Sequence, residues 1–126
     1  MNANQALAEL EQLSSQVERA VVLDANGSVL ASTDAGEALT GAALDLLAAA
    51  GELHSSAEEV SRAEVELGEG GLFVLREGGR VIAATTGPNP NSGLVAYDLR
   101  TCLQRSDEEK PKRRRATRKP KDGEDG

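Results

Sequence analysis

The sequence predicts an α+β domain with an antiparallel sheet, in the element order α-β-β-α-β-β-β-α. Two hairpin signals support this prediction, because Asn26-Gly27 and Gly78-Gly79 each separate two short apolar runs. Segments with apolar residues at helical spacing lie before the first hairpin, between the hairpins and after the second one. Antiparallel hairpins with helices set apart in sequence are typical of an α+β sheet and not of a doubly wound parallel one.

The first third of the chain predicts a helix that leads into a β-hairpin. The hairpin lies within residues 17–33, where the runs AVVL and SVLAS flank Asp24-Ala25-Asn26-Gly27. An Asn-Gly turn is favoured there because both central positions of such a turn need positive φ, which these two residue types tolerate. The apolar residues that predict the helix are Ala6, Leu10, Leu13 and Val17.

The middle of the chain, residues 39–56, predicts a helix rich in alanine and leucine. Thr40 is expected to cap its start, because a threonine hydroxyl can accept a hydrogen bond from a free backbone N–H. Gly41 and Gly51 weaken the prediction of one unbroken helix. The broad apolar face contains Ala42, Ala43, Leu46, Leu47, Ala50 and Leu53.

The next segment predicts three strands. Residues 61–67 alternate apolar and charged side chains, which indicates a half-exposed strand that could form an edge of the sheet. A glycine turn at residues 68–71 precedes the apolar run 72–75, which is consistent with a strand covered on both faces. Gly78-Gly79 then joins this strand to residues 80–86 in a second hairpin.

The last predicted element is a helix that follows the loop of residues 87–91. Asn91 or Ser92 can cap its start, because both side chains can accept a hydrogen bond from a backbone N–H. Its apolar residues are Leu94, Val95, Leu99, Cys102 and Leu103.

Charge divides the chain into a predicted domain, residues 1–106, and a basic tail, residues 107–126. The domain has six arginines, no lysine and fifteen acidic residues, a balance of −9, whereas the tail has a balance of +2. The segment 110–121 carries eight positive charges, no negative one and no large apolar residue, so we expect it to be disordered. The basic residues of this candidate electrostatic patch are Lys110, Lys112, Arg113, Arg114, Arg115, Arg118, Lys119 and Lys121.

Composition indicates a small protein with an aliphatic core, because the chain has one Phe, one Tyr and no Trp. Its first residues (MNANQ) lack the pattern of a secretory signal, and no apolar run approaches the roughly 18 residues that a membrane span needs. The single cysteine, Cys102, has no partner for a disulfide within the chain. We therefore expect a soluble cytoplasmic protein without membrane insertion.

Residues with catalytic chemistry are few. His54 is expected at the surface near a helix end, because neighbouring Glu52 and Glu58 lack the spacing of a metal site. Cys102 is expected to be a buried structural thiol and not a nucleophile, because it lies on an apolar helix face. The glycine-rich segments match neither G-x-x-x-x-G-K-[ST] nor G-x-G-x-x-G. The sequence therefore predicts no enzyme, no catalytic residue, no metal and no cofactor.

Four segments together resemble the roadblock/dynein light chain domain family. They are VERAVVLDANGSVLAST, GAALDLLAAAGEL, GGLFVLREGGRVIAATT and NSGLVAYDLR, within residues 3–105. Their order and the NSGL helix start make the match specific as a set. The resemblance implies a profilin-like fold, which is a five-stranded antiparallel sheet with helices on both faces. The family has no invariant catalytic residue, so none is transferred to this chain.

The resemblance also implies partners. Members of the family form homodimers or heterodimers through the third strand and the central helix, and prokaryotic members often regulate small Ras-like GTPases. It therefore implies a non-enzymatic homodimeric regulator or scaffold of such a GTPase, which acts by binding one nucleotide state in preference to the other. Arg62, Arg76 and Arg80 are candidates for an arginine that reaches a GTPase, and none of them is favoured. The implied dimer interface contains Ala43, Leu46, Ala50, Val65 and Leu67.

An alternative function depends on the tail. A nucleic-acid or anionic-partner binding module could neutralise about six to eight phosphates with the segment 110–121. The acidic domain would repel the same polyanion, and the tail lacks the aromatic residues that stack on single-stranded bases. The tail could instead fold back onto the acidic domain or bind an acidic partner.

Overall fold

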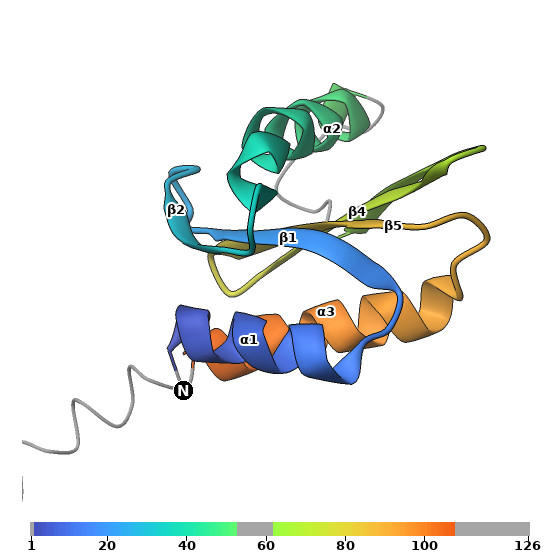
Figure 1. The fold of residues 1–126 in the computed structure, drawn as a ribbon. Coiled ribbons are helices and arrows are strands. Elements are labelled where there is room, and N and C mark those ends of the chain that lie inside the picture. The colour runs from blue at the N-terminus through green and yellow to red at the C-terminus, as the bar shows by residue number, and fades with distance from the viewer. Residues whose placement is uncertain (1, 53–61, 108–126) are drawn as a thin grey trace, which may run out of the picture.

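The computed structural model describes residues 2–52 and 62–107 of the chain. The elements follow the predicted order (Figure 1). They are α1 (Ala3–Leu13), β1 (Val17–Leu23), β2 (Val29–Ser32), the 3₁₀ helix η1 (Gly36–Leu39), α2 (Thr40–Glu52), β3 (Arg62–Leu67), β4 (Gly70–Glu77), β5 (Arg80–Thr86) and α3 (Ser92–Asp107).

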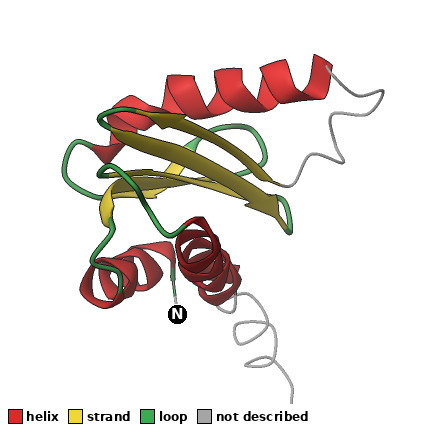
Figure 2. Cartoon of the chain, turned by 90° about the vertical axis from the view of Figure 1, so that its right-hand side faces the viewer, coloured by secondary structure: helices red, strands yellow, loops and turns green. Residues whose placement is uncertain are grey.

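The five strands form one antiparallel sheet in the order β2-β1-β5-β4-β3. Figure 1 shows α1 and α3 side by side beneath the sheet and α2 above it, and Figure 2 shows the same three layers from the side. We call the face of the sheet that α1 and α3 cover the closed face, and the face that α2 covers the open face. The predicted fold class, a five-stranded antiparallel sheet with helices on both faces, is confirmed.

The core consists of two layers because neighbouring strand residues point to opposite faces of the sheet. In β1, Val22 enters the layer on the closed face, whereas Val21 and Leu23 enter the layer on the open face. The closed-face layer contains Ala6, Leu7, Leu10, Ala20, Val22, Ala31, Phe73, Leu75, Ile82, Ala84, Val95, Leu99, Cys102 and Leu103. The open-face layer contains Val21, Leu23, Leu39, Ala43, Leu47, Val74, Val81 and Ala83.

Both predicted hairpins are present, but the first has a different turn from the one expected. Gly78 and Gly79 both have positive φ, as a tight two-residue turn requires. In the first hairpin only Gly27 has positive φ, and its N–H bonds to the Asp24 carbonyl at 3.0 Å. The Asp24 carboxylate accepts bonds from the N–H groups of Asn26 and Ser28. Asp24 therefore organises a longer turn, and Asn26 does not need a left-handed conformation.

Helix boundaries depend on local capping that the sequence predicted only in part. Asn91 caps α3 as expected, because its Oδ1 accepts a hydrogen bond from Leu94 N at 3.1 Å. The prediction that Thr40 caps α2 is wrong, because η1 leads directly into α2 and the Thr40 hydroxyl has no hydrogen-bond partner among the described residues. Val17, predicted on the first helix, is the first residue of β1. α1 begins instead with a capping box between Asn2 and Gln5.

Candidate protein-interaction site

Strand β3 is an edge of the sheet, as its alternating pattern suggested. It pairs with β4 on one side, and no strand of the described residues lies on its other side. The register places Ala63 opposite Val74 and Val65 opposite Leu72, so these two β3 residues lie on the open face. An edge strand presents unpaired backbone N–H and C=O groups, which a further strand can pair with.

Charged residues mark the other side of the same strand. Glu64 lies opposite Phe73, which belongs to the closed-face layer of the core. Its carboxylate forms an ion pair with Arg62 at 2.7 Å. The side chain of Val65 is 38% exposed on the opposite, apolar side of the strand. β3 is thus amphipathic, with its apolar side directed toward the region of α2.

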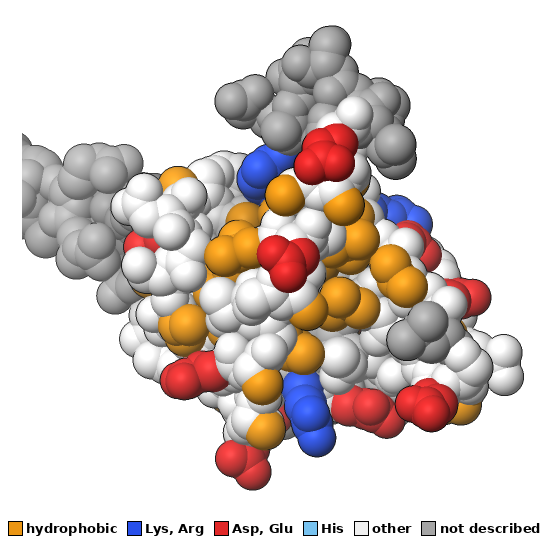
Figure 3. Space-filling model, turned by 90° about the horizontal axis from the view of Figure 1, so that it is seen from above, with side chains coloured by type: hydrophobic (Ala, Val, Ile, Leu, Met, Phe, Trp, Pro, Cys, Tyr) orange, Lys and Arg blue, Asp and Glu red, His pale blue; other side chains and the backbone are white. Residues whose placement is uncertain are grey.

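Helix α2 leaves part of the open face uncovered. Ala43 and Leu47 are buried against the sheet, whereas Leu44 is 40% exposed. The other exposed residues of α2 are Gly41, Ala42, Asp45, Ala48, Ala49 and Glu52. Figure 3 shows this side of the molecule, with hydrophobic side chains gathered along its middle and most acidic side chains near its rim.

A groove of about 430 Å³ lies between α2 and the strands β3, β4 and β5. Its apolar walls come from Ala42 and Leu46 of α2, Val65 of β3 and Leu72 of β4. We call it the α2–β3 groove. It adjoins the unpaired edge of β3, so the described part of the chain presents an apolar groove and open backbone groups at one place.

The residues of the implied dimer interface differ in their accessibility. Val65 lies in the α2–β3 groove, and Leu46 and Ala50 are partly buried. Ala43 is fully buried in the open-face layer, so its side chain is not accessible to a second chain. For Leu67 the register gives only its position, opposite Gly70.

Leu72 and Ala42 line the groove but were not among the predicted interface residues. The cross-strand pair of Leu72 with Val65 is a signal that the β3–β4 hairpin register could have supplied.

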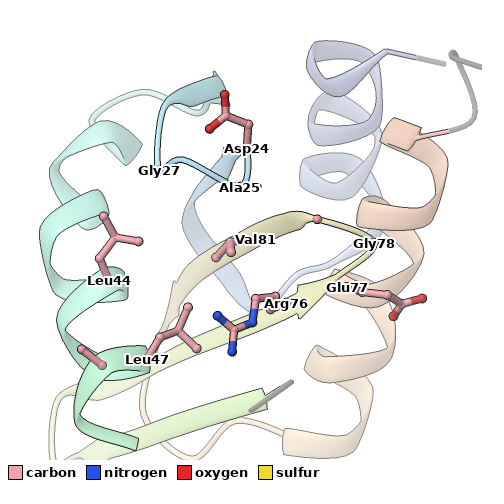
Figure 4. A pocket seen from close by; sticks show the side chains of 11 residues that line it. Asp24, Ala25, Gly27, Leu44, Leu47, Arg76, Glu77, Gly78 and Val81 are labelled. Atoms are coloured by element: carbon pink, nitrogen blue, oxygen red, sulfur yellow. The ribbon is translucent and has the colours of Figure 1, made fainter. Parts of the chain in front are cut away.

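A second pocket, of about 560 Å³, lies on the other side of α2, where the β1–β2 and β4–β5 turns meet (Figure 4). Figure 4 shows Leu44 and Leu47 pointing from α2 toward the sheet, and Arg76 pointing from β4 toward α2. Glu77 points away from this pocket and pairs with Arg100 of α3 at 3.2 Å. The pocket therefore combines an apolar floor with one guanidinium.

The three arginines considered for a GTPase contact have different surroundings. Arg62 is ion-paired with Glu64, and Arg76 lines the second pocket. Arg80 donates hydrogen bonds from Nη1 to the Ser106 carbonyl at 2.7 Å and to Ser106 Oγ at 3.1 Å. Arg80 therefore holds the end of α3 against the start of β5.

Cys102 is a buried thiol, as predicted. Its side chain is in the closed-face layer, and burial, assisted by the nearby Glu9 carboxylate, raises the pKa of Cys102 to about 12. The thiol is therefore protonated at neutral pH and unsuited to nucleophilic chemistry.

Other predicted features fall partly outside the described residues. His54 and the eight basic residues of the tail lie there. Within residues 2–52 and 62–107, no three His, Cys, Asp or Glu side chains form a group that could hold a metal ion. In the same part of the chain, no helix has both the length and the apolar character that crossing a bilayer requires.

The fold is similar to the folds of several proteins of known structure. No family model and no curated protein matches the chain. Among solved structures, a Roadblock/LC7 domain from Streptomyces avermitilis has a TM-score of 0.68 and 20% identity, covering 82% of this chain and 93% of that chain. The gliding protein MglB from Thermus thermophilus has a TM-score of 0.59 and 20% identity, covering 85% and 92%.

An MglB structure described as a tetrameric arrangement is also similar, with a TM-score of 0.59, 20% identity and coverage of 83% and 89%. These similarities extend over most of this chain and over nearly the whole of each related chain. The chain has the roadblock/LC7 fold.

Proposed function

We propose that this chain is a non-enzymatic, homodimeric regulator or scaffold of a small Ras-like GTPase. The observation that carries the proposal is the combination of an unpaired β3 edge, within the described residues, with the apolar α2–β3 groove beside it. The resemblance to the roadblock/dynein light chain family supports the choice of partner. A related MglB of the same fold is described in a tetrameric arrangement, which supports self-association.

The proposed homodimer joins two sheets through their β3 strands. A twofold axis would bring the same edge from each copy together, so that each strand satisfies the backbone groups of the other. Val65 would then be covered by the second copy, as would part of the α2–β3 groove. The small exposed residues of α2, such as Ala48 and Ala49, allow a second helix to approach closely.

The proposed regulation works through differential affinity. A protein that binds one nucleotide state of a GTPase more tightly shifts the population toward that state by no more than the affinity difference. The protonated Cys102 thiol and the absence of phosphate-loop motifs from the sequence support a non-enzymatic role. If GTP hydrolysis is accelerated, we propose that the dimer positions groups of the GTPase itself.

The dimer is tested by replacing Val65 with lysine and measuring mass in solution by light scattering. We expect the Val65→Lys chain to have half the mass of the wild type, because a charge would be buried in the joined sheets. Ala8→Lys, on the exposed side of α1, is the matched control and is expected to keep the wild-type mass. An unchanged mass for Val65→Lys would refute this interface.

The partner is tested by retention of small GTPases from the same cell on the immobilised chain. The GTPases are loaded with GDP or a non-hydrolysable GTP analogue before binding is measured. We expect retention in one nucleotide state only. If no GTPase binds in either state, the proposed function is wrong.

A further inference from the structure

The most exposed large apolar side chains of the described residues lie together on α1 and α3, the two helices that cover the closed face. Leu13, at the end of α1, is 70% exposed, and Tyr97, in the first half of α3, is 68% exposed. Both line a groove of about 170 Å³ between the two helices, which we call the α1–α3 groove. Tyr97 is the single tyrosine of a chain that has no tryptophan.

The same groove holds a carboxylate that has no partner among the described residues. Glu9 and Asp98 both line it, and Arg105 forms an ion pair with Glu9. The partly buried Asp98 side chain, in contrast, has no hydrogen bond or ion pair within residues 2–52 and 62–107. An aromatic face, an aliphatic wall and an acceptor for a cation therefore lie next to one another.

A lysine or arginine side chain fits this combination of groups. Its aliphatic stem can lie along Leu13, its charge can lie over the Tyr97 ring, and its N–H groups can bond to Asp98. The occupant we consider is the segment 110–121 of this chain, with eight positive charges and no negative one. The domain of residues 1–106, with its balance of −9, has the complementary charge.

The position of the end of α3 brings this segment within reach. Arg80 bonds to the carbonyl and hydroxyl of Ser106, whose side chain is fully buried, so the point where the chain leaves α3 is fixed. Asp98 lies nine residues before Asp107, which is about 13 Å along the helix axis. Six residues of extended chain span up to about 20 Å, so Arg113 can return to Asp98.

We infer that the segment 110–121 binds in cis to the α1–α3 groove, with the side chain of Arg113, Arg114 or Arg115 over Tyr97 and bonded to Asp98. Attachment to α3 gives the segment an effective concentration on the order of millimolar at this groove, which favours it over a separate chain. The inference does not depend on the proposed GTPase partner or on the β3 interface.

Tyrosine fluorescence tests this inference directly, because Tyr97 is the only tyrosine and no tryptophan obscures it. The full chain is compared with a variant carrying Arg113→Gln, Arg114→Gln and Arg115→Gln, which changes no residue of the described domain. We expect acrylamide quenching of Tyr97 to increase roughly two-fold in the variant, because a cation over one ring face leaves about half of the ring accessible. Salt at about 1 M should give the wild type the same increase, since it screens the attraction.

Two further variants test the site on the groove. Asp98→Asn removes the proposed acceptor and should raise quenching as the arginine replacements do. Asp45→Asn removes an equal charge from the exposed surface of α2, on the other side of the sheet, and should have no effect. Circular dichroism checks that each variant is folded. If Asp98→Asn does not fold, the arginine variant still tests the inference.

Three results would overturn the inference. Equal quenching in the wild type and the arginine variant would show that none of the three replaced arginines covers Tyr97. An Asp45→Asn effect as large as that of Asp98→Asn would show a diffuse attraction and no specific site. Quenching that changes over about a hundredfold range of protein concentration would assign the contact to a second chain, because binding in cis is independent of concentration.

Discussion

The two faces of the sheet are covered to different extents. Two helices cover the closed face, where Phe73 is completely buried, whereas one helix of the described residues covers the open face and leaves Val65 38% exposed. Five strands about 4.8 Å apart make a sheet about 19 Å wide between its outer strands. One helix is about 10–12 Å in diameter, so two helices match this width and one does not. Among the described residues, the closed face is therefore covered across its width, whereas part of the apolar open face stays accessible.

The largest expected difference between the faces concerns their apolar side chains. Phe73→Ala should lower the free energy of unfolding by about 3–5 kcal/mol, because it leaves a cavity in a closed layer. Leu72→Ala, its neighbour on the open face, should cost only about 1–2 kcal/mol, because Leu72 is partly exposed. Urea unfolding at one fixed protein concentration measures both values. Equal costs would show that the faces are equally covered.

The next effect concerns polar contacts on the closed face. Arg80→Ala should destabilise the domain by about 2 kcal/mol, because it removes charged hydrogen bonds to Ser106, whose side chain is buried. Arg100→Ala is the matched control, because its ion pair with Glu77 is about half exposed and should contribute at most about 1 kcal/mol. The same unfolding measurement compares them. A cost for Arg100→Ala as large as that for Arg80→Ala would contradict a special role for the Arg80 contact.

The third effect is absent at neutral pH and appears only at alkaline pH. The pKa of Cys102 is raised from 9.0 to about 12 in the folded chain, so its contribution to stability is complete below pH 9 and is lost as the pH rises toward 12. The wild type should therefore lose stability relative to Cys102→Ala by up to about 1.4 kcal/mol per pH unit in this range. Unfolding curves from about pH 8 to about pH 11 measure the difference. A constant difference would mean that water reaches the thiol on the closed face.

The sequence was sufficient to predict the order of elements, because that order depends on local signals. The alternation in β3 and the glycines at Gly78-Gly79 each act within a few residues. The entry into α2 could not be predicted in the same way, because η1 rather than the Thr40 hydroxyl precedes it. The preference of Thr40 for a capping position is overridden by tertiary packing, because Leu39 of η1 is buried against the sheet immediately before α2 begins.

The candidate site was less predictable than the fold. Ala42 and Ala43 are chemically identical neighbours on one helix, yet Ala42 lines the α2–β3 groove and Ala43 is buried beneath the helix. Their difference depends on how α2 is rotated on the sheet, which is a tertiary property. An alanine-rich helix specifies that rotation weakly, since small residues surround much of its circumference.

The strand order has a consequence for how the chain folds. β1 pairs with β5, so that Val17 lies opposite Thr86 and Leu23 lies opposite Val81, across 69 and 58 residues of sequence. The β1–β2 hairpin therefore has an open edge until β5 has been synthesised. Such long-range pairing slows folding, because a large loop must close before the strand contacts can stabilise it. During synthesis on a ribosome, the first half of this domain therefore cannot complete its sheet until the central strand, β5, has been made.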